Sequence, residues 1–491
     1  MTARTRTAAP LLVALSWAGA RLLLPPDAHN THTLMYPLVE AAGAYNTLEP
    51  FHPLYHPVVA LVRRLWEACG GAGPALPALQ AVSLLAGMAN LALIHRVVLR
   101  AGGSAAAAFG AAALAAVTQN LWSWSLMTTS YTLSTACALA AVHRLLSRER
   151  LDARDAAWAG AWTALATGFD TAAGLVALPA LYELRARGAK GASAAFGGGL
   201  VAVLAAAYAV FFHRLQLLGW PFPPTLAGLA ASLPRDIVPL WKSGDPFGQF
   251  AAFWRSDAPA DFPWLAAPAL LALSWRATSA RAWGERALWR LAAGLWAAVT
   301  AFFFLNDPQN RFVYAGGLLL PAVLATAAPR HWPGAVVLLF CFNLFRPPLY
   351  APDSNPGLAE ADWLAGRLAP GDLLVALSEP DWALSYGLMG RVGVVVLAGP
   401  GGGTARFRQS VMDEARAEEA ADRALCNGAK VVFAPDALYR STERDKTELD
   451  ARARRLVERW SRRYAAGPAW VSPRDQHYMP LAPKPGACAR P

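Results

Sequence analysis

Apolar segments about as long as a bilayer is thick recur along residues 1–350 and alternate with short polar connections. The hydrocarbon core of a bilayer is crossed by a helix of about 20 apolar residues. The pattern therefore predicts a bundle of about eleven membrane-spanning helices, of which the two around Asp170 can also be read as one re-entrant element. The predicted spans are 9–25, 75–98, 103–121, 126–146, 156–169, 171–184, 195–213, 263–275, 287–305, 312–328 and 332–349.

After a Pro-rich linker at residues 347–356 the pattern changes to that of a soluble domain. Short β-branched runs alternate there with amphipathic stretches, which predicts a small α/β domain with a largely parallel sheet. The fold is therefore expected to be mainly α: a polytopic membrane bundle (residues 1–350), then an exterior α/β domain (351–491). The predicted strands are 371–378, 391–399 and 430–436, and the predicted helices are 381–389, 409–427 and 442–465.

Composition and charge agree with a membrane protein. The chain has 491 residues, 55% of them hydrophobic, and its net charge of +11 would indicate a nucleic-acid partner only in a soluble protein. Here the basic residues cluster in every second connection, the positive-inside pattern, so the N-terminus is expected in the cytoplasm and the C-terminal domain outside. The abundance of Ala, Arg and Gly is typical of a GC-rich bacterial genome, so we expect the protein in a bacterial inner membrane. We expect no nucleic-acid partner. The clusters begin at Arg4, Arg96, Arg144, Arg185 and Arg276.

The first segment and the cysteines leave two questions open. Ala18-Gly19-Ala20 looks like a signal-peptidase site, whereas Arg21 and the apolar run after it favour an uncleaved anchor. The five cysteines form no metal or redox spacing. Cys426 and Cys488 share the exterior domain, where they either pair or remain free thiols.

The loop after the first span, Pro25–Pro57 (the first loop), carries the densest chemistry in the chain. Asp27 follows two prolines at the end of the span, where partial desolvation would suit a general base; the alternative is a solvated loop acid. Glu40 either faces the same mouth or is solvated. The loop also carries ring groups that could bind substrate. These groups are His29, His52, Tyr55 and His56. The HNTH and HPLYH pairs could bind a metal, but a metal needs three or four converging ligands, so histidines that only hydrogen-bond are favoured. A divalent cation, Mg²⁺ or Mn²⁺, is a possible cofactor of the protein.

Polar residues at membrane depth form a second group of candidates. Gln119, Asn120 and Tyr131 lie between the third and fourth predicted spans, where they either join neighbouring helices or line a cavity. Asp170, at the tip between the fifth and sixth spans, reads as an unpaired acid near lipid and is a candidate second catalytic acid.

Three cations are candidates for binding a lipid phosphate. Arg311 opens the tenth predicted span on the outer side, and Lys242 and Arg255 lie in the aromatic-rich loop 214–262. A guanidinium suits a phosphate, but the same residues could simply reach to the lipid headgroups. Gly399–Thr404 (GPGGGT) follows a predicted strand, yet it lacks the Lys-Ser/Thr of a phosphate loop, and a surface loop is favoured.

Four segments together resemble the GT-C superfamily of membrane glycosyltransferases, in particular its bacterial protein O-mannosyltransferase-like branch. HPLYHP (His52–Pro57) is similar to that branch's HPPGYPLY, and LWSWSLMTTSYTL (Leu121–Leu133) to its WSQ…EVYTL. ATGFDTAAGLVALPA (Ala166–Ala180) resembles its next hairpin. LAPGDLLVALSEPDWALSYGL (Leu368–Leu388) resembles the opening of its exterior domain.

The resemblance implies an enzyme that moves a sugar from a polyprenyl-phosphate donor to a hydroxyl of a protein, glycan or lipid acceptor. It assigns Asp27 as the catalytic base of a single, inverting displacement. Three positions depart from the branch: Asn30 and Thr129 replace acids, and Phe169-Asp170 replaces a polar pair. Glu40 or Asp170 supplies the second acid, or none is needed, or activity is lost. A lipid or solute transporter and an inactive scaffold therefore remain alternatives.

Overall fold

The computed structural model divides the chain into two compact units. The helical unit holds residues 1–26, 49–58 and 77–349, and the C-terminal unit holds 27–48, 59–76 and 350–491. The described residues are 14–19, 52–71, 75–125, 127–188, 190–217, 282–305, 319–345, 356–376, 384, 388, 391–397, 411–412, 414–434, 454–485 and 488.

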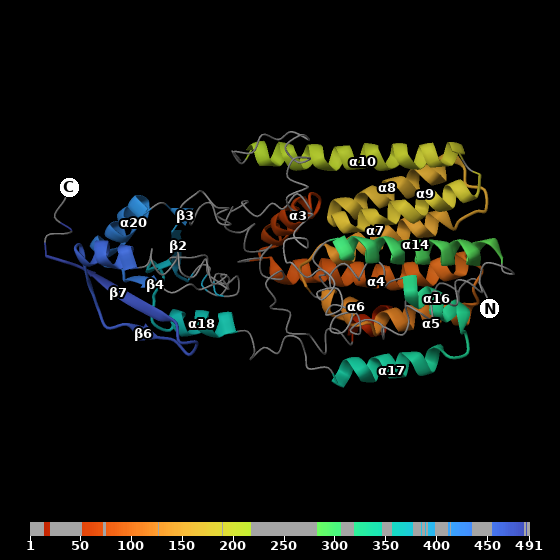
Figure 1. The fold of residues 1–491 in the computed structure, drawn as a ribbon. Helices are drawn as coiled ribbons and strands as arrows, with labels where there is room; N and C mark the ends of the chain where they lie inside the picture. The colour runs from red at the N-terminus through yellow and green to blue at the C-terminus, as the bar shows by residue number, and fades with distance from the viewer. Residues whose placement is uncertain are drawn as a thin grey trace. The chain divides into compact units, whose positions relative to one another are not determined.

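Helices account for nearly all of the described part of the helical unit (Figure 1). Two of them are long and apolar enough to cross a membrane, Leu76–Arg100 and Gly191–Phe211, and two apolar helices are shorter, Ala105–Ala116 and Trp332–Cys341. The expected number of eleven spans stays a prediction. The elements are α4 (Leu76–Arg100), α5 (Ala105–Ala116), α6 (Gln119–Trp124), α7 (Tyr131–Leu145), α8 (Ala153–Phe169), the 3-10 helix η2 (Thr171–Val176), α9 (Ala177–Ala186), α10 (Lys190–Leu217), α14 (Trp283–Leu305), α16 (Leu319–Ala327) and α17 (Trp332–Phe345).

Small residues allow the helices of this unit to approach closely. α8 packs along both α7 and α10. A Cβ added to Gly160 would lie 2.0 Å from the carbonyl oxygen of Phe196, and one added to Gly199 would lie 2.2 Å from that of Ala157. Both glycines are therefore needed where α8 crosses α10, as is common where apolar helices associate through close backbone contact.

A buried ion cluster joins α9 to α14. The carboxylate of Glu183 is fully buried; it accepts from Arg187 at 2.8 Å and from two nitrogens of Arg290 at 2.6 and 2.9 Å. Arg187 also donates to the carbonyl oxygens of Leu145 and Arg148, at 2.9 and 3.1 Å. The cluster thus fixes the end of α7 as well. A carboxylate buried in this way is tolerated because it is paired with charge and hydrogen bonds.

The C-terminal unit contains a mixed sheet with strand order β3-β2-β1-β4-β7-β5, and β6 pairs with β7. Strands β1 to β4 run parallel, whereas β7 is antiparallel to β4, β5 and β6. The strands are β1 (Leu373–Ala376), β2 (Gly393–Leu397), β3 (Val411–Met412), β4 (Val431–Ala434), β5 (Tyr464–Ala466), β6 (Trp470–Val471) and β7 (His477–Pro483).

Helices cover both faces of this sheet. On one face, α20 (Glu414–Cys426) and the helical residues 454–461 pack on Val375, Val431 and Phe433. On the other, α18 (Pro356–Ala365) packs on Leu374 and Val432. Because successive strand residues point to opposite faces, these near-continuous apolar runs fill both layers.

Two predicted helices of this unit were placed wrongly at one end. The predicted helix 409–427 starts only at Glu414, since Val411–Met412 form β3. The predicted helix 442–465 ends at residue 461, since Tyr464 begins β5. Its residues 442–453 lie outside the described part, as does most of the predicted helix 381–389, where Leu384 and Leu388 are helical.

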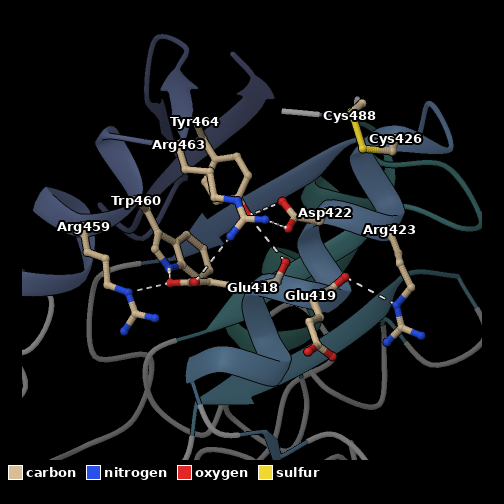
Figure 2. Close-up of polar contacts among 10 residues, drawn as sticks. All are labelled: Glu418, Glu419, Asp422, Arg423, Cys426, Arg459, Trp460, Arg463, Tyr464 and Cys488. Atoms are coloured by element: carbon tan, nitrogen blue, oxygen red, sulfur yellow. Dashed lines mark hydrogen bonds and ion pairs between the residues drawn. A yellow bond between two sulfur atoms is a disulfide. The ribbon is translucent and has the colours of Figure 1, made fainter. Parts of the chain in front are cut away.

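Charged side chains and one tyrosine hydroxyl join α20 to residues 459–464, a contact that we call the α20 charge network (Glu418, Asp422, Arg459, Arg463 and Tyr464; Figure 2). Glu418 accepts from Arg459 at 2.8 Å, and Asp422 accepts from Arg463 and, at 2.7 Å, from the Tyr464 hydroxyl. Burial, followed by the hydrogen bond to Asp422, raises the pKa of Tyr464. Beside the network, Cys426 and Cys488 form a disulfide, so the alternative of two free thiols is wrong.

Candidate functional site

The end of the first loop is held against the turn between α8 and η2. The backbone N–H of Leu54 donates to the carbonyl oxygen of Gly168 at 2.9 Å. Two residues earlier, the Nδ1 atom of His52 lies 2.7 Å from the carbonyl oxygen of Phe169. A Cβ on Gly168 would come within 2.6 Å of the Leu54 side chain, so any larger residue here would force that side chain to shift.

The start of α7 meets the same histidine. Ser130 occupies the N-cap position of α7, yet its side chain makes no capping bond. Its Oγ lies instead 3.1 Å from His52 Nδ1. The Tyr131 ring contacts His52 edge-on, with centroids 6.0 Å apart, and Trp124 in turn packs on Tyr131 at 4.7 Å. We call His52, Leu54, Ser130, Gly168 and Phe169 the loop–hairpin lock.

Asp170 follows directly on the lock. It ends α8 in an extended conformation, with φ −151°, and its carboxylate caps η2 by accepting from the Ala172 N–H at 3.1 Å. Because the side chain is buried and hydrogen-bonded, the interpretation of Asp170 as an unpaired acid is wrong. Its proposed part in catalysis stays a prediction.

Three further buried residues surround the lock: Tyr55, His56 and Thr129. Tyr55 and His56 are buried in the first turn of α3 (Tyr55–Ala68), a helix where the sequence predicted the end of a loop and no helix. Thr129, which stands where the resemblance expects an acid, is 1% exposed, and among the described residues its Oγ1 has no hydrogen-bond partner. A buried hydroxyl thus lies where the resemblance implies a carboxylate.

The lock therefore unites three of the segments singled out in the sequence: the HPLYHP end of the first loop, the segment Leu121–Leu133 and the hairpin Ala166–Ala180. Of the candidate residues, His52 belongs to the lock, Tyr131 contacts His52 edge-on, and Asp170 directly follows Phe169. Ser130 and Gly168 were missed. The signal for Gly168 was its place at a helix end, directly before Phe169-Asp170, whereas serine at an N-cap position normally caps the helix.

The remaining candidates are not placed by the structure. Gln119 and Asn120 belong to α6, but their side chains are outside the described part. Within the described residues no group of three His, Cys, Asp or Glu side chains is arranged to hold a metal. The possible divalent cation stays a prediction. The candidates that lie entirely outside the described residues are Asp27, His29, Glu40, Lys242, Arg255 and Arg311.

No protein-family model matches this sequence, and no curated protein sequence matches it. Among solved structures, the chain is similar to ArnT from Cupriavidus metallidurans bound to undecaprenyl phosphate, with a TM-score of 0.62 and 13% identity over 98% of both chains. It is also similar to the apo state of that protein, with a TM-score of 0.59 and 12% identity over 93% of both chains. The chain therefore has the GT-C glycosyltransferase fold, as the resemblance predicted. The O-mannosyltransferase-like branch stays a prediction.

Proposed function

We propose that this protein is a membrane glycosyltransferase that moves a sugar from a polyprenyl-phosphate donor to an acceptor hydroxyl on the outer face of a bacterial inner membrane. The observation that carries the proposal is the fold, which matches ArnT bound to undecaprenyl phosphate along 98% of each chain. Fold alone does not determine activity, so residues must supply the chemistry.

In the proposed reaction Asp27 removes the proton from the acceptor hydroxyl as the oxygen attacks the anomeric carbon. The bond from that carbon to the phosphate oxygen breaks in the same displacement, which inverts the sugar. A cation (Arg311, Lys242 or Arg255) stabilises the departing polyprenyl phosphate, a contribution that is largest in the transition state. Asp170 or Glu40 is the second acid.

The C-terminal unit supports an extracytoplasmic location for the reaction. Its disulfide, between Cys426 and Cys488, is of a kind that forms and persists mainly in oxidising compartments such as the periplasm. This agrees with the positive-inside distribution of Arg and Lys, which assigns the same domain to the exterior. The acceptor would then also be exterior: a protein, a glycan or a lipid.

The proposal is tested with purified protein in lipid nanodiscs and labelled polyprenyl-phosphate mannose, glucose and arabinose. Wild type is compared with Asp27→Asn and Glu40→Gln, with acceptor extract present, and with Mg²⁺, Mn²⁺ or chelator added. We expect transfer, or slow donor hydrolysis, by wild type and its loss in Asp27→Asn. General-base catalysis typically contributes about 10²- to 10⁴-fold, which sets the size of that loss.

A second candidate is an inactive relative that acts as a scaffold, favoured by the neutral Thr129 and by Asp170 being occupied as a helix cap. Donor binding without turnover by wild type would support it. Absence of binding to every donor would instead favour a transporter.

A further inference from the structure

The contact between His52 and the hairpin has a defined direction. A carbonyl oxygen only accepts hydrogen bonds, so the Nδ1 atom that lies 2.7 Å from the Phe169 oxygen carries the hydrogen. The neutral ring then holds its lone pair on Nε2. His52 thereby acts on the hairpin through Nδ1–H, and Ser130 Oγ, 3.1 Å from the same atom, lies on the same side of the ring.

The carbonyl that His52 contacts belongs to the peptide bond that joins Phe169 to Asp170. The N–H on the other side of that bond, from Asp170, donates to the carbonyl oxygen of Ala166 at 2.9 Å. Both polar groups of this planar unit are thus hydrogen-bonded. Because the peptide plane cannot rotate without breaking one of these bonds, the position of the Asp170 Cα is fixed, and the separate bond from the Ala172 N–H then sets the direction of its carboxylate.

Two further contacts lie directly beside the bond from His52. Leu54 N–H donates to the oxygen of Gly168, one residue before Phe169, and the Leu54 side chain fills the space over Gly168. The carboxylate of Asp170 is anchored on its far side by the Ala172 N–H. The residue is therefore held from the first loop, from α8 and from η2.

We propose that His52 is a positioning residue: through the Phe169–Asp170 peptide it holds the Asp170 carboxylate in place as the second acid of the transfer reaction. This inference rests on the proposed function and gives His52 a role other than contact with substrate. A displacement of about 1 Å in a catalytic group can cost on the order of 10²-fold in rate.

Two substitutions of the same residue separate the possible roles. The side-chain amide N–H of asparagine superposes on Nδ1–H of histidine, whereas that of glutamine reaches the position of Nε2. We expect His52→Gln to lower kcat by about 10- to 100-fold with KM changed less than about threefold. We expect His52→Asn to keep kcat within about threefold of wild type, because it preserves the bond to Phe169.

A measurement independent of activity follows the lock itself. Amide hydrogen exchange of the peptide that contains the Leu54 N–H is compared in full-length wild type and variants. We expect faster exchange in His52→Gln and in Gly168→Ala, which pushes Leu54 away, and unchanged exchange in His52→Asn. The matched control is Gly198→Ala, at a helical glycine where an added Cβ meets nothing within 4 Å.

Each outcome decides the matter. Wild-type transfer with His52→Asn as slow as His52→Gln would mean direct chemistry by the ring and would overturn the positioning role alone. Unchanged exchange in both His52→Gln and Gly168→Ala would also overturn it. No transfer by wild type from any donor would instead defeat the proposed function, and with it a catalytic part for Asp170.

Discussion

The loop–hairpin lock and the α20 charge network solve the same problem, joining two segments distant in sequence, with opposite chemistry. The lock uses backbone groups and a histidine ring, and its side-chain bond ends on a backbone carbonyl, with His52 only 5% exposed. The network joins charged side chains to each other, and its arginines Arg459 and Arg463 have side chains 50% and 41% exposed.

This difference shows what each contact can achieve. A hydrogen bond to a buried peptide group fixes the backbone and leaves little freedom for the residue that follows, here Asp170. Ion pairs between exposed side chains are screened by water and salt and typically contribute about 0–1 kcal/mol each. We therefore expect the lock to determine the position of Asp170. We expect the network to contribute only weakly to the stability of the C-terminal unit.

The largest effect is expected where charge is buried. Glu183→Ala leaves Arg187 and Arg290 without their carboxylate, and removing one partner of a buried pair costs about 3–5 kcal/mol. Thermal unfolding in detergent should therefore show a markedly lower unfolding temperature for Glu183→Ala than for wild type. The control is Glu67→Ala, which removes an exposed pair with Arg63. Equal effects of the two substitutions would contradict the distinction between buried and exposed charge.

The disulfide gives the next largest effect. It closes a sequence separation of 62 residues, so replacing Cys426 and Cys488 by serine is expected to destabilise the C-terminal unit by about 2–4 kcal/mol. Pulse proteolysis of the full chain measures this. Cys69→Ser, at an exposed free cysteine, should leave proteolysis unchanged. A double Cys→Ser variant as resistant as wild type would show that the bond adds nothing to this region.

A smaller effect is expected in the charge network. Asp422→Asn removes the negative partner of Arg463 and weakens the bond from the Tyr464 hydroxyl. Since these groups are partly exposed, we expect a loss of about 1 kcal/mol that shrinks at high salt. Unfolding in urea, detected by proteolysis, is measured for wild type and Asp422→Asn at low and at high salt, and the loss of stability is compared between the two salt conditions. A loss independent of salt would assign the effect to the hydrogen bond alone.

The smallest effect is a pH dependence. The folded-state pKa of Tyr464 is raised, so folding retains a proton that the unfolded chain releases. This contribution is complete below the unfolded value of about 10 and is lost as pH rises above it toward the folded value. Stability of the C-terminal unit should thus fall more steeply above about pH 10 in wild type than in Tyr464→Phe. Parallel pH curves would refute this.

The helices of the bundle were the most predictable part of the fold, because long apolar runs between basic clusters leave few alternatives. Predicted spans 75–98 and 195–213 correspond to α4 and α10. The runs that became β1, β2 and β4 were equally clear. The antiparallel strands β5, β6 and β7 were missed. β5 (YAA) and β6 (WV) are too short to show a period, and β7 (HYMPLAP) contains two prolines, which are unusual in a strand.

The lock could be predicted only in part. Its histidine and the hairpin stood out by residue type, but their pairing depends on a backbone carbonyl and on the absence of a side chain at Gly168. Neither leaves a signature in a single sequence. For the same reason Ser130 was not among the candidates, although its hydroxyl lies 3.1 Å from the Nδ1 atom of His52, 78 positions away.

The most direct test of the account compares one variant from each region in the same nanodisc preparation. The initial rate of sugar transfer from a polyprenyl-phosphate donor and the proteolysis midpoint of the C-terminal unit are both measured for His52→Gln and Asp422→Asn. We predict that His52→Gln lowers the rate of transfer and leaves the proteolysis midpoint of the C-terminal unit unchanged. Asp422→Asn should leave the rate unchanged and shift that midpoint to a lower urea concentration. Transfer that is insensitive to His52→Gln, or absent in wild type, would contradict the account.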